Sequence, residues 1–227
     1  MSLPYNIKIL SAVGSDEVGV GDYLAPLVVA SVQVDAELIP RLTEIGVKDS
    51  KAMTDSRICD IADQIKDLLP HKTVVLANKQ YNAMVDAGIN ANGIKSFLHN
   101  KTLTELVNSL KSYPEYIIVD DFASRDLHFK YLRTLPKQPP ILEQNVHFVK
   151  KGESVHIAVA AASILARATF ARYMDQLAKE LEMEILKGAS AKVDSCAQDI
   201  ARKYGVNFLK DHCKWHFANT KRVLDNC

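Results

Sequence analysis

Short apolar runs near the start of the chain predict three β-strands. The run 7–17 alternates apolar and polar positions before it breaks at glycines, and the run 26–34 is rich in β-branched residues. Only a glycine-containing bend at 17–23 separates these two runs, so we expect them to lie side by side as a hairpin. A third strand is predicted at 72–78.

Apolar residues at helical spacing predict helices after these strands. The segment 49–69 carries a candidate N-cap, Thr54, followed by apolar residues three and four positions apart. The segment 90–111 has the same periodicity, and the last third of the chain is expected to be mostly helical. The helices expected there cover about 155–182, 192–204 and 207–213.

Two further strands are predicted in the middle of the chain. The segment 115–122 is a short apolar run ending in two acidic residues, which is typical of a buried parallel strand, and 146–153 is the other candidate. The sequence contains no repeat, low-complexity tract or linker, and its proline cluster at 135–140 is interpreted as a surface loop. The expected fold class is therefore α/β, with helices on the faces of a mixed sheet in a single domain, 1–227.

The composition is that of an ordinary globular protein, with 48% apolar and 24% charged residues. The net charge of +1 argues neither for nor against a nucleic-acid partner. The cysteines form no CxxC pair, which favours reduced thiols and a cytoplasmic location. The most apolar stretch, Ile157–Ala166, is too short to cross a bilayer, and the first residues lack the features of a signal peptide. We therefore expect no membrane association.

Acidic residues follow apolar segments at three separate places. Asp16 and Glu17 are adjacent near the end of the first strand, Asp120 ends the fourth, and Glu153 precedes an alanine-rich helix. On a regular strand Asp16 and Glu17 would point to opposite faces, so we expect the strand to stop at Asp16 and leave Glu17 free to turn toward the same rim. Of the neighbours Asp120 and Asp121, alternation allows only one to join a common site.

These acids favour a metal site if they converge. Four carboxylates would provide the all-oxygen ligands that suit Mg²⁺ or Mn²⁺ rather than Zn²⁺, and their mutual repulsion would require bound cations. Two such ions can activate water and stabilise a leaving oxygen in phosphoryl transfer. The alternative is that each acid is a helix cap or a solvated turn residue. Zinc bound by His212, Cys213 and His216 is a weaker hypothesis, since no second pair of ligands is evident. Trp215, His216 and Phe217 are expected to pack the C-terminal helices instead.

Several motifs, in order, resemble those of the type 2 ribonuclease H family. They are GSDEVGVGDYLAPLVVASV, VKDSKAMTDSRI, IIVDDF and KKGESVHIAVAAASILAR. The segments NANGIKSFLHN, LKGASAKVD and KWHFANT resemble the ribonuclease HIII branch of that family rather than the HII branch. The resemblance extends from about Gly14 to Thr220 and covers nearly the whole chain.

This resemblance implies a fold, an activity and a set of site residues. The fold is a five-stranded mixed sheet flanked by helices, with extra C-terminal helices. The activity is cleavage of the RNA strand of RNA–DNA hybrids, giving 5′-phosphate and 3′-hydroxyl ends, with two Mg²⁺ or Mn²⁺ ions. The implied catalytic metal ligands are Asp16, Glu17, Asp120 and Glu153. The implied substrate-binding residues, which contact phosphate or read the 2′-hydroxyl through the glycine backbone, are Gly19, Val20, Gly21, Lys51, Lys151, Ser154 and Ser190.

Three features depart from the family pattern. Val20 stands where a Lys or Arg is usual between the glycines, and Ala25 replaces a glycine near the substrate face. The N-terminal substrate-binding domain of the HIII branch is expected to be absent, which would weaken hybrid binding. Two alternatives therefore stay open beside a monomeric hybrid-cleaving enzyme. One is HII-like incision at single ribonucleotides in DNA, and the other is a hybrid-binding module with weak or lost catalysis.

Overall fold

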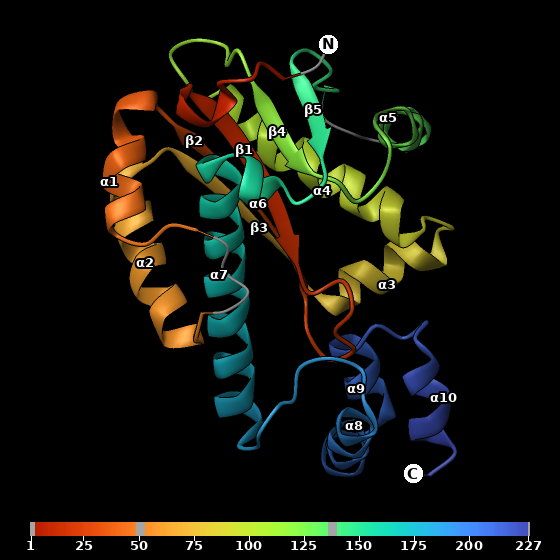
Figure 1. Cartoon of the computed structure of the whole chain (residues 1–227). Helices are drawn as coiled ribbons and strands as arrows, with labels where there is room; N and C mark the ends of the chain where they lie inside the picture. Colours follow the sequence, from red (N-terminus) through yellow and green to blue (C-terminus); the bar gives the residue numbers. More distant parts are fainter. Residues whose placement is uncertain (1–2, 49–52, 136–139, 227) are drawn as a thin grey trace. The chain divides into compact units, whose positions relative to one another are not determined.

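The strands form one five-stranded sheet with the order β3-β2-β1-β4-β5 (Figure 1). Strand β4 runs parallel to both of its neighbours. Its residue Ile117 lies opposite Val13 of β1 on one side and opposite Val146 of β5 on the other. Strands β1 and β2 are neighbours, as the sequence predicted. The strand bounds are β1 Ala12–Val18, β2 Leu27–Val34, β3 His71–Leu76, β4 Ile117–Asp120 and β5 Val146–Val149.

Helices follow most of the strands, so the predicted α/β class with a mixed sheet is confirmed. Thr54 caps the second α-helix as predicted, because its side chain accepts a hydrogen bond from the backbone of Arg57. The α-helices are α1 Ile39–Glu44, α2 Asp55–Leu68, α3 Asn78–Asp86, α4 Ala91–Val107, α5 Arg125–Thr134, α6 Gly152–Val155, α7 Ile157–Leu181, α8 Ala191–Tyr204, α9 Val206–His212 and α10 Ala218–Leu224. Two 3-10 helices are η1 Ile7–Ile9 and η2 Ala36–Leu38.

The computed structural model describes residues 3–48, 53–135 and 140–226. The chain divides into two units, each of which gathers segments far apart in the sequence. The first unit contains 1–18, 29–74 and 92–168, and the second contains 19–28, 75–91 and 169–227. Every acidic residue of the predicted metal site falls in the first unit.

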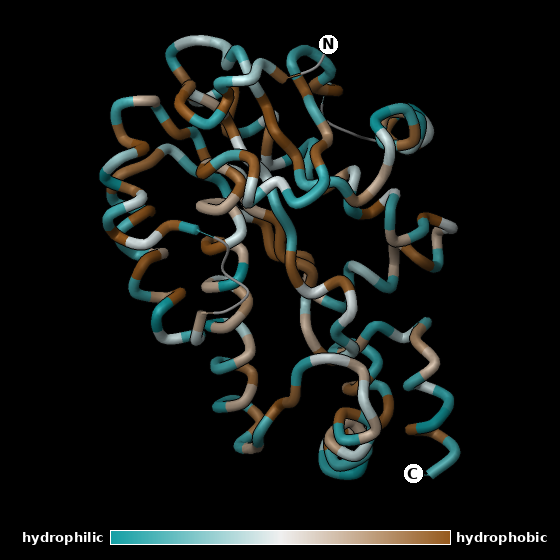
Figure 2. Tube along the Cα trace, viewed as in Figure 1, coloured by the Kyte–Doolittle hydropathy of each residue, from teal (hydrophilic) through white to brown (hydrophobic). Residues whose placement is uncertain are grey.

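Two apolar layers in the first unit cover opposite faces of the central strands. On one face, Ile117 and Val119 pack against residues of α4 and α5. On the other face, Ile118 packs with Ala12 of β1 and Val159 of α7. This alternation is the strand period of two, applied to a strand that is buried on both faces. In Figure 2 the central strands carry the brown colour of hydrophobic residues along much of their length.

Several boundaries differ from the sequence-based expectation. The strand expected at 7–17 begins only at Ala12, because Ile7–Ile9 forms a 3-10 helix, and it continues through Glu17 instead of stopping at Asp16. The strand expected at 146–153 ends at Val149, because the chain turns into α6 through Lys151, which has a left-handed φ of 55°. The short helices α1, α3, α5 and α10 were not predicted.

Helix α7 is long and apolar enough to cross a membrane by length and composition. It is longer than the run 157–166 from which no membrane span was expected. However, 67% of its most apolar window is buried inside the protein, which is the behaviour of a core helix. The alanines at its start allow this close approach, since Ala158, Ala160, Ala161 and Ala162 are almost fully buried.

We expect the buried histidine of α5 to make the fold sensitive to acid. Burial, with smaller contributions from His99 and Arg125, lowers the pKa of His128 to about 3, against an ordinary value of 6.5. Above pH 6.5 His128 is neutral in both the folded and the unfolded chain, and the fold keeps its full free energy of unfolding. As the pH falls from 6.5 toward 3, only the unfolded chain takes up the proton, so the free energy of unfolding decreases. Between about pH 7.5 and pH 5 this loss is about 2 kcal/mol. Urea unfolding of wild type and His128→Phe at both pH values measures it, and equal losses in the two proteins would contradict the assignment.

Candidate functional site

Asp16 lies on β1 and points toward α7. Its side chain is almost buried, and it accepts hydrogen bonds from the Glu17 backbone N–H, at 2.8 Å, and from Ser163 on α7. Burial raises the pKa of Asp16 to about 8, and the nearby charges of Glu17 and Asp120 add to this effect. An acid with so high a pKa holds a proton readily in the absence of a cation, and a divalent ion would replace that proton.

Glu17 follows on the same strand and points to the opposite face, toward α4. Its Oε2 lies 3.0 Å from Nε2 of His99, and its Oε1 lies 3.4 Å from Nζ of Lys95. Burial alone would raise the pKa of Glu17, but the hydrogen bonds and charges of His99 and Lys95 outweigh it and lower the pKa. At neutral pH and without a bound cation, Glu17 is therefore ionised while Asp16 is protonated, although the two residues are adjacent.

Asp120 and Glu153 come from the next strand and the short helix after it. The register pair Ser15–Val119 immediately precedes Asp16 and Asp120 on the two parallel strands, so these two acids lie beside each other at the end of the sheet. The Asp120 Oδ1 accepts a 2.7 Å hydrogen bond from the backbone N–H of Gly152 at the start of α6. That bond brings the first turn of α6, and with it Glu153, against the end of β4.

All four predicted acids line one pocket of about 380 Å³. Its lining residues are Asp16, Glu17, Val18, Asp120, Glu153, Ser163 and Arg167. Arg167 is the cation among them; its guanidinium is partly exposed and lies 4.0 Å from Asp55. The pocket therefore presents carboxylate oxygens together with a positive group of the kind that contacts phosphate.

The acids share this pocket without meeting at one point. Among the described residues, no group of three or more His, Cys, Asp or Glu side chains is close enough together to hold a metal ion. The alternation along β1 explains this, because it directs Asp16 toward α7 and Glu17 toward α4. The expectation that the strand would stop at Asp16 was wrong, and Glu17 reaches the rim from the other side of the sheet. The donor set remains one of oxygen ligands only, which fits Mg²⁺ or Mn²⁺.

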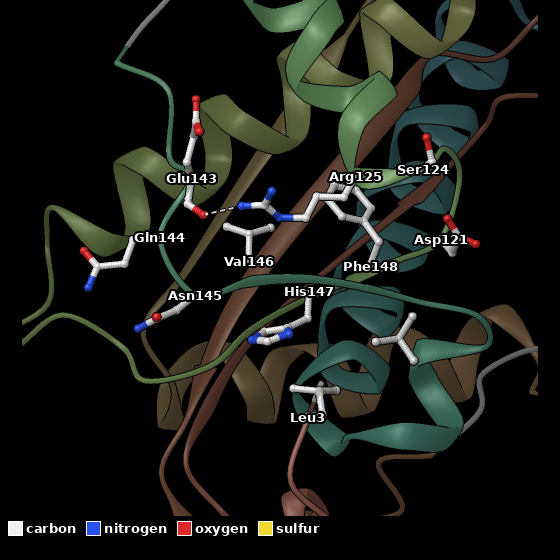
Figure 3. Close-up of a pocket in the computed structure, with 11 residues that line it drawn as sticks. Leu3, Asp121, Ser124, Arg125, Glu143, Gln144, Asn145, Val146, His147 and Phe148 are labelled. Carbon is white, nitrogen blue, oxygen red and sulfur yellow. Dashed lines mark hydrogen bonds between the residues drawn. The ribbon is translucent and has the colours of Figure 1, made fainter. Parts of the chain in front are cut away.

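Asp121 was left out of the predicted site, and the structure gives it another environment. It lines a separate hollow of about 790 Å³ beside the edge strand β5 (Figure 3). In that hollow Arg125 donates a 3.1 Å hydrogen bond to the backbone carbonyl of Glu143, which Figure 3 shows as a dashed line. Asp120 and Asp121 thus serve different surfaces, as strand alternation predicted.

The predicted substrate residues lie in several places. Lys151, two residues before Glu153, and Ser154, directly after it, are both exposed. The Ser154 backbone N–H donates a 2.8 Å hydrogen bond to the Lys151 carbonyl. Lys51 lies outside the described residues. Ser190 is exposed and precedes the first turn of α8 in the second unit, where its carbonyl accepts a 2.9 Å hydrogen bond from the Val193 N–H.

The glycine segment 19–21 also belongs to the second unit. Gly19 has a φ of +95°, and a Cβ there would lie 2.0 Å from the carbonyl oxygen of Pro26, so only glycine fits. Val20 is partly buried, whereas Gly21 is exposed and a Cβ there would meet nothing within 4 Å. Gly19 is thus required by the turn, while Gly21 leaves backbone open to solvent.

The residues just after this segment are held by the loops that precede α8 and α10 in the same unit. Lys214 is fully buried and donates hydrogen bonds to the carbonyls of Asp22, at 2.6 Å, and Ala25, at 2.5 Å. The Tyr23 N–H donates a 2.8 Å hydrogen bond to the carbonyl of Gly188. Ala25, one of the departures from the family pattern, is buried and holds this lysine through its carbonyl.

The weaker zinc hypothesis for the C-terminal segment finds no support among the described residues. The ring of His212 stacks on Phe208 with centroids 4.0 Å apart, and its Nδ1 hydrogen-bonds the Phe208 carbonyl. The ring of His216 stacks on Tyr81 at 5.6 Å. His212 therefore packs within α9 and His216 packs on α3, so packing accounts for both side chains.

Neither His99 nor Lys95 was predicted as a site residue from the sequence. The two residues are four positions apart, so they project from the same face of a helix. A polar pair on the buried face of a helix that otherwise carries Ile94, Leu98 and Leu103 was the available signal. Their common partner, Glu17, could not be identified without the pairing of α4 with β1.

Known proteins match the chain over most of its length. The family model described as Ribonuclease HII matches residues 13–220. A ribonuclease HIII from Bacillus mycoides (strain KBAB4) is 45% identical over 222 residues, which cover 97% of this chain and 70% of that protein. A ribonuclease HIII from Bacillus cereus (strain ATCC 10987 / NRS 248) is 44% identical over the same share.

Solved structures give the same result. The crystal structure of Bst-RNase HIII in complex with Mn²⁺ superposes with a TM-score of 0.92 at 44% identity, covering 97% of this chain and 71% of that one. The ribonuclease H2 from Pyrococcus horikoshii OT3, at 22% identity and a TM-score of 0.75, shares the fold over 95% of this chain and 98% of that one. The chain therefore belongs to the type 2 ribonuclease H family, within which it is similar to the ribonuclease HIII proteins.

Proposed function

We propose that this protein is a metal-dependent endoribonuclease that cleaves the RNA strand of RNA–DNA hybrids and leaves 5′-phosphate and 3′-hydroxyl ends. The observation that carries the proposal is the single pocket lined by Asp16, Glu17, Asp120 and Glu153. The similarity to a ribonuclease HIII that binds Mn²⁺ supports a divalent ion at such a pocket. We further propose a monomeric, cytoplasmic enzyme that uses two ions, Mg²⁺ or Mn²⁺.

Two bound ions would activate a water molecule and stabilise the leaving 3′-oxygen. Asp16, whose pKa the charges of Glu17 and Asp120 help to raise, would hold the ions together with these two residues and Glu153. Glu17, ionised through Lys95 and His99, is ready to accept a cation without first losing a proton. Asp120 is held by the backbone of α6, and Arg167 is placed to attract the phosphate. The chain thus contributes orientation and charge.

Recognition of RNA is assigned to the exposed backbone of the glycine segment. A 2′-hydroxyl can both donate and accept hydrogen bonds, and it distinguishes RNA from DNA at a given nucleotide. Gly21 offers backbone groups without a side chain, while Gly19 keeps the turn in shape. Lys151, Ser154 and Ser190 are exposed and available to contact phosphate or support the site.

Gly21→Ala is expected to impair substrate binding without affecting folding. A Cβ at this position meets no atom of the protein within 4 Å, so the free energy of unfolding should change by less than about 1 kcal/mol. The same Cβ would occupy the space that a close-lying ribose requires, so KM for the hybrid should rise roughly 10-fold. Steady-state kinetics together with thermal unfolding measure both quantities. An unchanged KM would show that the substrate does not approach Gly21.

The proposal is tested with an end-labelled RNA–DNA hybrid under separate titrations of Mg²⁺ and Mn²⁺. Metal-dependent cuts in the RNA strand, with 3′-hydroxyl ends, are expected. A DNA duplex that contains one ribonucleotide distinguishes the HII-like alternative, because efficient cutting of that duplex would favour it. Binding of the hybrid with no cleavage under either metal would instead support a binding module.

A further inference from the structure

His99 is fully buried on α4, and both of its ring nitrogens are hydrogen-bonded. Nε2 lies 3.0 Å from Oε2 of Glu17, and Nδ1 lies 2.7 Å from the hydroxyl oxygen of Ser15. An ionised carboxylate can only accept hydrogen bonds, so Nε2 carries the proton of the first of these. Glu17 and Ser15 lie on the same face of β1, and the imidazole ring spans the distance between them.

The Ser15 end of this chain continues into a buried polar network. The Ser31 hydroxyl lies 3.1 Å from that of Ser15 and 2.9 Å from that of Thr102. Thr102 in turn lies 3.1 Å from the carbonyl oxygens of Leu98 and His99 on its own helix. Ser15, Ser31 and Thr102 are all fully buried. The ring of His99 is thus fixed at the end away from the pocket.

The other oxygen of Glu17 and the face of the imidazole ring are also held. The Lys95 ammonium lies 3.4 Å from Oε1 of Glu17 and 4.6 Å from the ring centre of Phe122. Phe122 stacks on the His99 ring, with centroids 4.9 Å apart and planes 17° apart. These contacts leave Glu17 a single orientation at the rim of the acid pocket.

A buried polar network of this kind is costly unless each member is satisfied, and an apolar residue at position 99 would pack the same space. His99 and Lys95 both contact a predicted metal ligand from this face of α4, and His99 is the one whose ring links Glu17 to the buried network. We propose that His99, held by Ser15, is a positioning residue that fixes the carboxylate of Glu17 for a divalent cation. The proposal rests on the metal-dependent function proposed above.

The test measures the affinity of the whole protein for Mn²⁺ without nucleic acid. Binding is detected by calorimetry or by the electron paramagnetic resonance signal of free Mn²⁺. His99→Leu should weaken binding about 10- to 100-fold, the usual effect of losing a residue that supports a metal ligand. His99→Gln should recover part of the affinity, because its amide can still donate to Glu17. Ser15→Ala, which keeps the ring but removes its support, should give an intermediate loss.

His128→Leu is the matched control. It removes another buried histidine whose ring contacts Phe122, with centroids 5.9 Å apart, and whose Nδ1 has no hydrogen-bond partner. It should change stability while leaving Mn²⁺ affinity within about two-fold of wild type. A role of His99 in packing alone would shift the unfolding temperature of His99→Leu without weakening Mn²⁺ binding, and that result would overturn the proposal.

Three other outcomes are informative. Tighter Mn²⁺ binding in His99→Leu would mean that His99 holds Glu17 away from the cation, and it would also overturn the proposal. A second case is that wild type binds Mn²⁺ more tightly than His99→Leu does, yet cuts no hybrid. That result would support the positioning role and refute the proposed function. If His99→Leu fails to fold, the comparison of His99→Gln and Ser15→Ala with wild type decides, and unchanged affinity in both would overturn the proposal.

Discussion

Asp16→Asn is expected to abolish hybrid cleavage, lowering kcat by about 10³-fold or more, and to stabilise the metal-free protein. The activity is lost because a neutral amide cannot replace a carboxylate that would hold the divalent ions. The stability rises because the pKa of Asp16 is about 8 in the fold, against an ordinary value of 3.8. The metal-free fold therefore loses stability as the pH rises from about 4 to 8, and asparagine avoids that loss.

The measurements are single-turnover cleavage and chemical unfolding in EDTA at about pH 8, where the variant should be more stable by at least about 1 kcal/mol. Hybrid affinity without metal should stay close to that of wild type. Asp121→Asn is the control, because Asp121 is exposed and lines another hollow, so both activity and stability should be unchanged. An Asp16→Asn protein that still cleaves, or that is less stable in EDTA, would contradict this role.

Gly14→Ala is expected to destabilise the protein by about 3 kcal/mol or more. A Cβ on Gly14 would lie 2.2 Å from the backbone carbon of Ala158 and 2.3 Å from the nitrogen of Val159, so β1 and α7 would have to separate. For a chain of this length the unfolding midpoint should fall by about 6–12 °C. Asp16 shares this face of β1, so the acid pocket should be displaced too.

Thermal unfolding of Gly14→Ala and Gly21→Ala, compared with wild type, measures this effect. The second variant adds the same methyl group where no protein atom lies within 4 Å, so it controls for the loss of a glycine from the unfolded chain. Equal midpoints for the two variants would show that the backbones of β1 and α7 are not in the close contact described here.

The sheet could be predicted because its strands have strong sequence signals. The run Leu27–Val34 and the buried strand Ile117–Asp120 are apolar and β-branched, and turn residues bound them. The acidic segments could be predicted for the same reason, since each follows such an element. The α/β class and the order of the major elements follow from this level of the sequence.

The direction of Glu17 could not be predicted in the same way. Glycines after Glu17 suggested a strand that ends early, but β1, which lies between β2 and β4 in the sheet, continues to Val18. Long-range pairing therefore overrode a local turn signal. The polar network behind Glu17 depends on the same tertiary contact, because Ser15 and His99 lie 84 residues apart.

Short helices escaped prediction for another reason. Helix α5 has ten residues, and the buried side chains that hold it are Phe129 and Leu132 together with the unusual His128. Its cap, Ser124, accepts a hydrogen bond from the Leu127 N–H, but a single serine before a polar segment is a weak signal. Such helices are stabilised by packing rather than by local propensity.

The central claim is that carboxylates from separate segments bind divalent ions in the pocket at the end of β1 and β4. Anomalous diffraction from crystals soaked in Mn²⁺ tests it most directly. We expect anomalous density within coordination distance of Asp16 and Asp120, with Glu17 or Glu153 completing the ligands and the density absent from Asp16→Asn crystals. Mn²⁺ bound only elsewhere on the protein, in active enzyme, would contradict the account.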